Sequence, residues 1–149
     1  MVLVNFEQLY ADFVMHHYKN SMYRGLLPAS TCSVEGSNTS CGDSIIIHLE
    51  EGESTIQAVR FEGEGCAISQ ASASVMAEIL EGKTYDEARE IVESFEKMLR
   101  GESFNESLIG DALFFQGLKD HPMRVKCVNL PWKTVAKALA LNEQKKTGA

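Results

Sequence analysis

The sequence has few cationic residues, and none of them precedes Lys19. Its 149 residues contain 14 lysines and arginines against 21 aspartates and glutamates, which gives a formal net charge of −7. A nucleic-acid backbone is bound by clustered cations, so this balance predicts no nucleic-acid partner. The first residues also lack the basic and apolar pattern of a signal peptide.

Long hydrophobic runs are missing as well. No apolar run approaches the roughly 18 residues that a membrane-spanning helix needs, so we expect no membrane partner and a cytoplasmic location. The chain has no internal repeat and no low-complexity linker. A chain of this length suits one domain, residues 1–149, which buries roughly 68–70% of its unfolded surface and needs no metal merely to collapse.

Hydrophobic periodicity predicts one helix, then a small antiparallel sheet, then a block of helices, which is the α+β class. Asn5 and Gln8 fit a capping box for the first helix, as Thr84 and Glu87 do for a later one. Pro131 is tolerable only in a first helical turn. The expected helices cover residues 5–20, 67–80, 85–101, 107–118 and 130–142, and the expected strands cover residues 31–35, 44–50 and 56–62.

Cysteine is scarce, and its four positions are informative: Cys32, Cys41, Cys66 and Cys127. In a reducing compartment, four cysteines favour metal or thiol chemistry over disulfides. Cys41 and Asp43 are two residues apart at the start of the second predicted strand. In an extended chain such residues face the same side, so both side chains can converge on one ion. Gly42 between them allows a bend.

Cys66 and Cys127 each lie at a predicted element boundary. Cys66 opens a helix, where unpaired N–H groups and the helix dipole stabilise a thiolate. Cys127 comes just before the last predicted helix, next to Arg124 and Lys126. Either cation could bias a nearby thiol towards thiolate or hold a negatively charged persulfide. Three cysteines and one carboxylate make a ligand set that suits a tetrahedral metal ion.

Spacing alone does not decide the chemistry. The 25- and 61-residue gaps between the three cysteines match no zinc-finger pattern, so a metal site and a thiol site both stay open. Cys32 lies in a polar segment without a paired ligand, and we expect it to be structural. The histidines are expected on the surface, with His121 kept as an outside candidate because it is nearest Cys127.

Three runs resemble the motifs of the IscU/SufU family of iron–sulfur cluster assembly proteins. They are Thr39–Asp43, the run Gly63–Ser74 that contains Cys66, and Arg124–Cys127. The resemblance covers nearly the whole chain. It implies the SufE/NifU-like (IscU-like) fold, with a three-stranded antiparallel sheet packed against helices. It also implies that Cys41, Asp43, Cys66 and Cys127 are the ligands.

Departures from the scaffold branch point to the sub-type. Lys126 stands where that branch usually has a histidine, the segment His121–Lys126 replaces its chaperone-recognition motif, and the stretch between Cys66 and Cys127 looks longer. These features resemble SufU, a zinc-containing sulfur acceptor. The resemblance implies Zn²⁺ as cofactor and a SufS-like, pyridoxal-phosphate cysteine desulfurase as partner. It further implies Cys41 as sulfur acceptor, with a possible assisting role for Arg124.

The product of such a transfer would pass to a SufBCD-like cluster assembly complex. The chain would then be a sulfurtransferase-like partner of the desulfurase and not a stand-alone enzyme. Two alternatives remain at this point. An IscU-type scaffold would assemble a transient [2Fe–2S] cluster on the same four ligands, with the carboxylate making the cluster labile. An interaction module would hold a purely structural metal.

Overall fold

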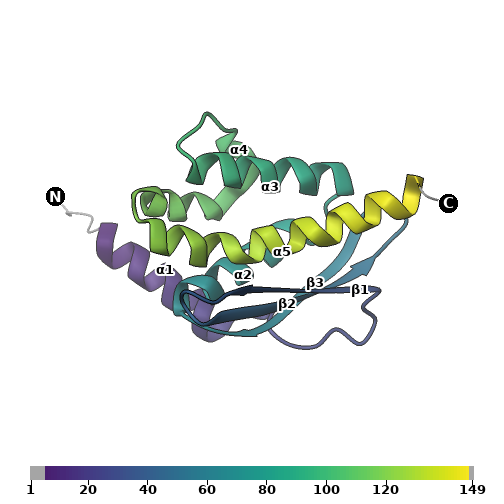
Figure 1. Cartoon of the computed structure of the whole chain (residues 1–149), viewed down its shortest axis with the longest axis horizontal. Coiled ribbons are helices and arrows are strands. Elements are labelled where there is room, and N and C mark those ends of the chain that lie inside the picture. The colour runs from purple at the N-terminus through teal and green to yellow at the C-terminus, as the bar shows by residue number, and fades with distance from the viewer. Residues whose placement is uncertain (1–5, 148–149) are drawn as a thin grey trace.

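The order of the elements follows the expected one, with a helix and three strands before the remaining helices. The computed structural model describes residues 6–147. Figure 1 shows the strands side by side and the helices gathered on one side of them, which confirms the α+β prediction. The elements are α1 (Phe6–Asn20), β1 (Cys32–Asn38), β2 (Asp43–Glu51), β3 (Ile56–Glu64), α2 (Ala67–Leu80), α3 (Tyr85–Leu99), α4 (Glu106–Ile109), the 3₁₀ helix η1 (Gly110–Asp120) and α5 (Pro122–Thr147).

The sheet is an antiparallel meander with the order β1-β2-β3. Ile45, Ile47 and Leu49 alternate along β2 and are almost completely buried, because successive side chains of a strand point to opposite faces. Ile47 lies opposite Val34 on β1 and opposite Phe61 on β3. This alternation fixes the register, since a slip by one residue would expose the whole apolar set.

Helices α2 and α5 cover the buried face of the sheet, α3 packs against α5, and α1 packs against α2. Inside this stack the rings of Phe95 and Trp132 lie face to face, with centroids 4.0 Å apart. Ser72 joins the two central helices: its hydroxyl donates to the Val128 carbonyl (2.6 Å) and accepts from Trp132 Nε1 (2.9 Å). This contact holds α2, whose N-cap is Cys66, against α5, which contains Cys127.

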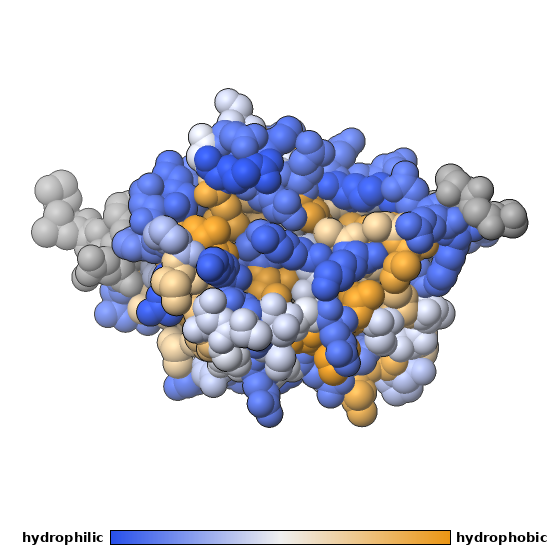
Figure 2. Space-filling model, viewed as in Figure 1, coloured by the Kyte–Doolittle hydropathy of each residue, from blue (hydrophilic) through white to orange (hydrophobic). Residues whose placement is uncertain are grey.

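The outer surface is mostly hydrophilic. In Figure 2 hydrophilic residues dominate the upper edge of the molecule, and hydrophobic residues are visible along the middle, over α5. No helix within residues 6–147 is long and apolar enough to cross a bilayer.

Local capping signals predicted the helix starts well. Thr84 and Glu87 form the reciprocal capping box of α3. Cys66 is the N-cap of α2, and its sulfur accepts a hydrogen bond from the Ser69 backbone N–H. The predicted cap of α1, Asn5, lies outside the described residues. The helical piece expected over 107–118 is present as the single turn α4 followed by η1.

The prediction for the last helix was wrong. It starts at Pro122 and not near Leu130, so Cys127 lies inside α5 and not before it. Pro131 is accommodated in the middle of the helix, although proline lacks the N–H that an internal position uses. The carbonyl that loses its helical donor is that of Cys127, four residues earlier. Side chains bond two other carbonyls of this stretch: Ser72 donates to Val128, and Thr134 donates to Leu130 at 2.7 Å.

Candidate metal centre

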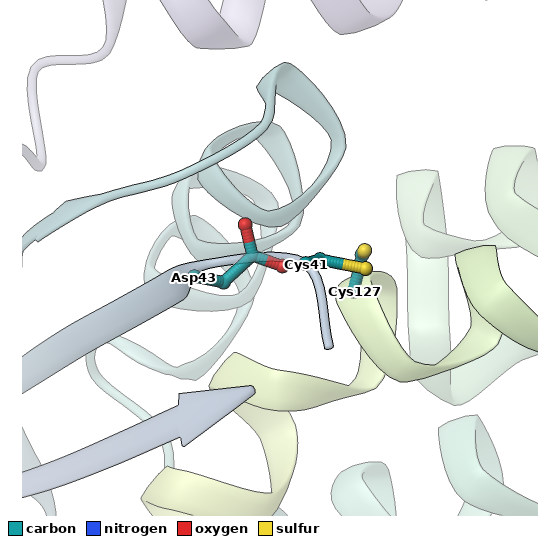
Figure 3. A group of neighbouring side chains, drawn as sticks. All are labelled: Cys41, Asp43 and Cys127. Carbon is teal, nitrogen blue, oxygen red and sulfur yellow. The ribbon is translucent and has the colours of Figure 1, made fainter. Parts of the chain in front are cut away.

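Three of the four predicted ligands meet at one end of the sheet. Cys41 comes from the turn between β1 and β2, Asp43 is the first residue of β2, and Cys127 reaches over from α5. One ligand atom from each lies within 4.8 Å of the others. Figure 3 shows the sulfur atoms of Cys41 and Cys127 side by side, with one carboxylate oxygen of Asp43 turned towards them.

The backbone brings Cys41 and Asp43 together by a bend. We expected both residues on one extended strand, but Gly42 has a φ of +68° and Cys41 lies in the turn. This φ falls in the left-handed region that glycine occupies without steric cost. The convergence of the two side chains therefore depends on the turn and not on strand periodicity.

Cys66, the fourth predicted ligand, adjoins the cluster without belonging to the group of three. As the N-cap of α2, its sulfur accepts from the Ser69 backbone N–H at 3.4 Å. Its own backbone N–H donates to Asp43 Oδ1 at 2.9 Å. The start of α2 is thus tied to the cluster through Asp43.

The carboxylate of Asp43 gives a test of whether a cation fits here. The side chain is 2% exposed. Oδ1 receives the N–H of Cys66, whereas Oδ2 is buried without a hydrogen-bond partner in the described chain. A buried carboxylate oxygen left unpaired is costly. A metal ion bound between this oxygen and the neighbouring thiols would remove that cost, and sulfur with carboxylate oxygen is a donor set that zinc accepts.

The protonation of Cys127 differs from our expectation. Burial, followed by the nearby side chains of Cys41 and Asp43 and the charge of Cys66, raises the pKa of the Cys127 thiol well above its ordinary value. The cations expected to act the other way, Arg124 and Lys126, both lie on the exposed part of α5. In the metal-free protein Cys127 is therefore a thiol, and a metal that binds it must displace its proton.

The remaining cysteine and the histidines lie outside this cluster. Cys32 is at the far end of β1, opposite Leu49, where burial raises the pKa of its thiol. His121 is exposed. His48 and His17 are less exposed than expected: His48 bonds Ser33 and Glu62, each at 2.7 Å, and His17 bonds Ser74 at 2.9 Å.

Sequence reasoning missed one residue of the site, Asn38. Asn38 pairs with Asp43 across the β1–β2 hairpin, and its Nδ2 lies 3.9 Å from Cys127 Sγ, in position to donate. Its position three residues before Cys41 could have indicated this, because the turn over residues 39–42 places Asn38 opposite Asp43.

A groove of about 890 Å³ lies between α1 and η1. Tyr10 forms part of its wall together with exposed apolar side chains, Leu9 of α1 and Phe114 of η1. His121, which directly precedes α5, closes it.

Comparison with known proteins decides the family. The sequence model of the NifU-like N-terminal domain matches residues 9–128, a segment that contains all four predicted ligands. The chain belongs to this family. The predicted resemblance to IscU and SufU proteins is thereby confirmed.

Relatives within the NifU-like N-terminal domain family carry two kinds of name. The chain is 39% identical to "Iron-sulfur cluster assembly scaffold protein IscU" of Thermotoga maritima, covering 90% of this chain and 94% of the relative. It is 36% identical to "Zinc-dependent sulfurtransferase SufU" of Bacillus subtilis, covering 93% and 95%. A crystal structure described as a putative iron–sulfur cluster assembly scaffold protein for the SUF system, from Fervidobacterium islandicum, is similar with a TM-score of 0.85. It is 41% identical and covers 89% of this chain and 98% of its own.

Proposed function

We propose that this protein works in iron–sulfur cluster assembly as a zinc-bound sulfur acceptor. It would take persulfide sulfur from a cysteine desulfurase and pass it to the complex that builds the cluster. The observation that carries the proposal is the group of Cys41, Asp43 and Cys127, in which a buried carboxylate oxygen has no partner. The similarity to the B. subtilis zinc-dependent sulfurtransferase over 93% of the chain supports the same function.

Zinc would be held by Cys41, Asp43, Cys66 and Cys127. Bound zinc keeps coordinating thiols deprotonated at neutral pH. The chain supplies a hydrogen-bond donor to three of these ligands. Asn38 faces the sulfur of Cys127, the Ser69 N–H bonds the sulfur of Cys66, and the Cys66 N–H bonds Asp43. Such outer donors orient ligands and strengthen metal binding.

Cys41 is the best candidate for the sulfur acceptor. It is only partly buried, whereas Cys127 is 1% exposed. Asn38 and the Ser69 N–H face the sulfurs of Cys127 and Cys66, and the described residues supply no such donor to the sulfur of Cys41. The Cys41 thiolate would attack the terminal sulfur of the desulfurase persulfide. A new S–S bond forms on Cys41, the S–S bond of the donor breaks, and the donor cysteine leaves as a thiolate with the electron pair.

Arg124 is the candidate for assisting this transfer. It lies on α5 three residues before Cys127, so both side chains share one face of the helix. Its exposed guanidinium could attract the anionic persulfide of an incoming partner. A cytoplasmic location and a hand-over to a SufBCD-like complex complete the proposal. The chain would thus act with the desulfurase and not as a stand-alone enzyme.

The alternative is an IscU-type scaffold that assembles a transient [2Fe–2S] cluster on the same ligands. It is supported by the 39% identity to the T. maritima protein, which is named a scaffold. The residue beside Cys127 favours the sulfur acceptor, because Lys126 is an exposed cation there and offers no imidazole ligand. Among residues 8–145, no histidine joins the cluster of Cys41, Asp43 and Cys127.

Desulfurase turnover tests the proposal. Zinc-loaded protein is expected to stimulate the release of alanine from cysteine by a SufS-like desulfurase, and Cys41→Ala should abolish the stimulation. Cys32→Ala is the matched control, because it removes a cysteine at the far end of β1. Equal stimulation by wild type and Cys41→Ala would remove the acceptor role. Anaerobic reconstitution that gives a stable, transferable chromophore would favour the scaffold instead.

A further inference from the structure

Three side chains form a chain of hydrogen bonds across all three strands of the sheet. Ser33 of β1 lies directly opposite His48 of β2, and its Oγ is 2.7 Å from His48 Nδ1. On the other side of the ring, His48 Nε2 is 2.7 Å from Glu62 Oε2 on β3. His48 lies five positions after Asp43, which is about 17 Å along an extended strand. The group is therefore separate from the metal centre.

The group lies on the outer face of the sheet. Ile47 and Leu49 are completely buried in the core that α2 and α5 cover, so the side chain of His48 between them points the other way. The side chain of His48 is 12% exposed, whereas Ser33 is an exposed residue. The imidazole is thus largely shielded, while the hydroxyl beside it is open to an incoming molecule.

The carboxylate of Glu62 decides which nitrogen of His48 carries the proton. An ionised carboxylate only accepts hydrogen bonds, so the neutral imidazole has its N–H on Nε2. Nδ1 then has a free lone pair, and the hydroxyl of Ser33 donates to it. Arg60, which lies opposite His48 on β3, is bonded to Glu81 at 2.8 Å and not to Glu62. The three side chains therefore have the arrangement of a nucleophile, its base and an acid that orients the base.

A hollow of about 730 Å³ lies along the same strands. Glu35, Ile46 and Glu64 contribute to its wall, and each is two residues along its strand from a member of the group. Residues two apart in a strand share a face, so the hollow adjoins the group on the outer side of the sheet. The wall contains two carboxylates against one cation, Lys137. This charge balance disfavours an anionic ligand.

We propose that Ser33, His48 and Glu62 form a nucleophilic site that takes the acyl group of a small activated ester without a negative charge. As Ser33 Oγ attacks the carbonyl carbon, His48 Nδ1 takes the hydroxyl proton. A new O–C bond forms on Ser33, and the bond from the acyl carbon to the leaving alcohol breaks. The alcohol leaves with the electron pair and receives the proton from His48. The step uses only groups of this face and does not rest on the proposed zinc site.

Acylation of the full chain by p-nitrophenyl acetate, located by tandem mass spectrometry, tests the proposal. Ser37 is the internal control, because it is an exposed serine on the same strand and face, opposite Ser44 instead of a histidine. A positioned base contributes about 10²- to 10⁴-fold, so Ser33 should be acetylated about 100-fold faster than Ser37. Equal rates at these two serines of the wild-type protein would overturn the proposal without any substitution.

Variants separate a reactive group from a merely structural one. His48→Gln can keep hydrogen bonds to both Ser33 and Glu62, so its Tm should stay close to that of wild type. It lacks a base, and acetylation of Ser33 should fall about 100-fold; an unchanged rate would overturn the proposal. Glu62→Gln should also slow the reaction, because the proton is then no longer fixed on Nε2.

Two controls define the reacting atom and the class of ester. Cys32→Ala should leave the acetylation of Ser33 unchanged, and its loss in this variant would assign the reaction to the neighbouring thiol instead. p-Nitrophenyl hemisuccinate carries a carboxylate and should acylate Ser33 more slowly than p-nitrophenyl acetate does. Equal rates with the two esters would overturn the proposed substrate class.

Discussion

Replacing Gly65 by alanine should damage the metal centre directly. Gly65 has a φ of +145°, a conformation that side chains other than glycine rarely adopt. A Cβ built there would overlap Asp43 Oδ1 and lie 2.9 Å from Asp43 Cγ. The displaced oxygen is the one that accepts the backbone N–H of Cys66. Alanine would therefore strain the backbone and also push the carboxylate away from its donor.

Gly25→Ala separates these two effects. Gly25 has a similar φ of +133°, but a Cβ there meets nothing within 4 Å. Both variants should lose about 1–3 kcal/mol of unfolding free energy from backbone strain, which lowers the Tm by about 2–4 °C per kcal/mol in a chain of this size. Only Gly65→Ala should also weaken zinc binding, by about 10- to 100-fold, or about 1.4–2.8 kcal/mol.

Calorimetry of the metal-free variants measures the first effect, and chelator competition measures the second. If Gly65→Ala holds zinc as tightly as Gly25→Ala, then the position of Asp43 next to the start of α2 is not required for binding. The reasoning from the buried carboxylate would then fail.

Three further predictions concern packing and pH. Ser72→Ala should cost about 1–3 kcal/mol in denaturant unfolding, because it leaves Trp132 Nε1 and a buried carbonyl unpaired; an unchanged midpoint would contradict this. The raised pKa of Cys127 means that the metal-free fold keeps a proton which the unfolded chain loses above its ordinary pKa of 9.0. The unfolding free energy of the metal-free protein should therefore fall as pH rises past about 9, whereas zinc affinity should rise with pH. A metal-free stability that rises together with zinc affinity would contradict this prediction. Burial lowers the pKa of His17 below 6.5, so stability present above that pH should decline as pH falls, and His17→Gln should flatten the decline.

Local signals explain why most of the fold could be predicted. The alternation of Ile45, Ile47 and Leu49 indicates a strand with one buried face, and the pair Thr84 and Glu87 is enough to start α3. These features depend on neighbours within a few residues along the chain. The ligand residues were also visible in the sequence, because Cys41 and Asp43 are adjacent to a glycine that allows the turn.

Contacts between distant segments explain what could not be predicted. Pro131 is typical of a helix start, whereas α5 continues through it and packs against α2, a segment distant in the sequence. The raised pKa of Cys127 follows from burial under the sheet and from its thiol neighbours, and the charges beside it in the sequence suggested the opposite. Tyr10 belongs to α1, and nothing near it in the chain indicates that its hydroxyl is buried without a partner among the described residues.

Persulfide mapping tests the central claim most directly. Zinc-loaded protein is incubated with a cysteine desulfurase and cysteine, and the peptides that contain Cys32, Cys41, Cys66 and Cys127 are compared by mass spectrometry. The account predicts one added sulfur on Cys41 and none on the other three. Sulfur on Cys66 or Cys127, or no added sulfur on a protein that retains its zinc, would contradict it.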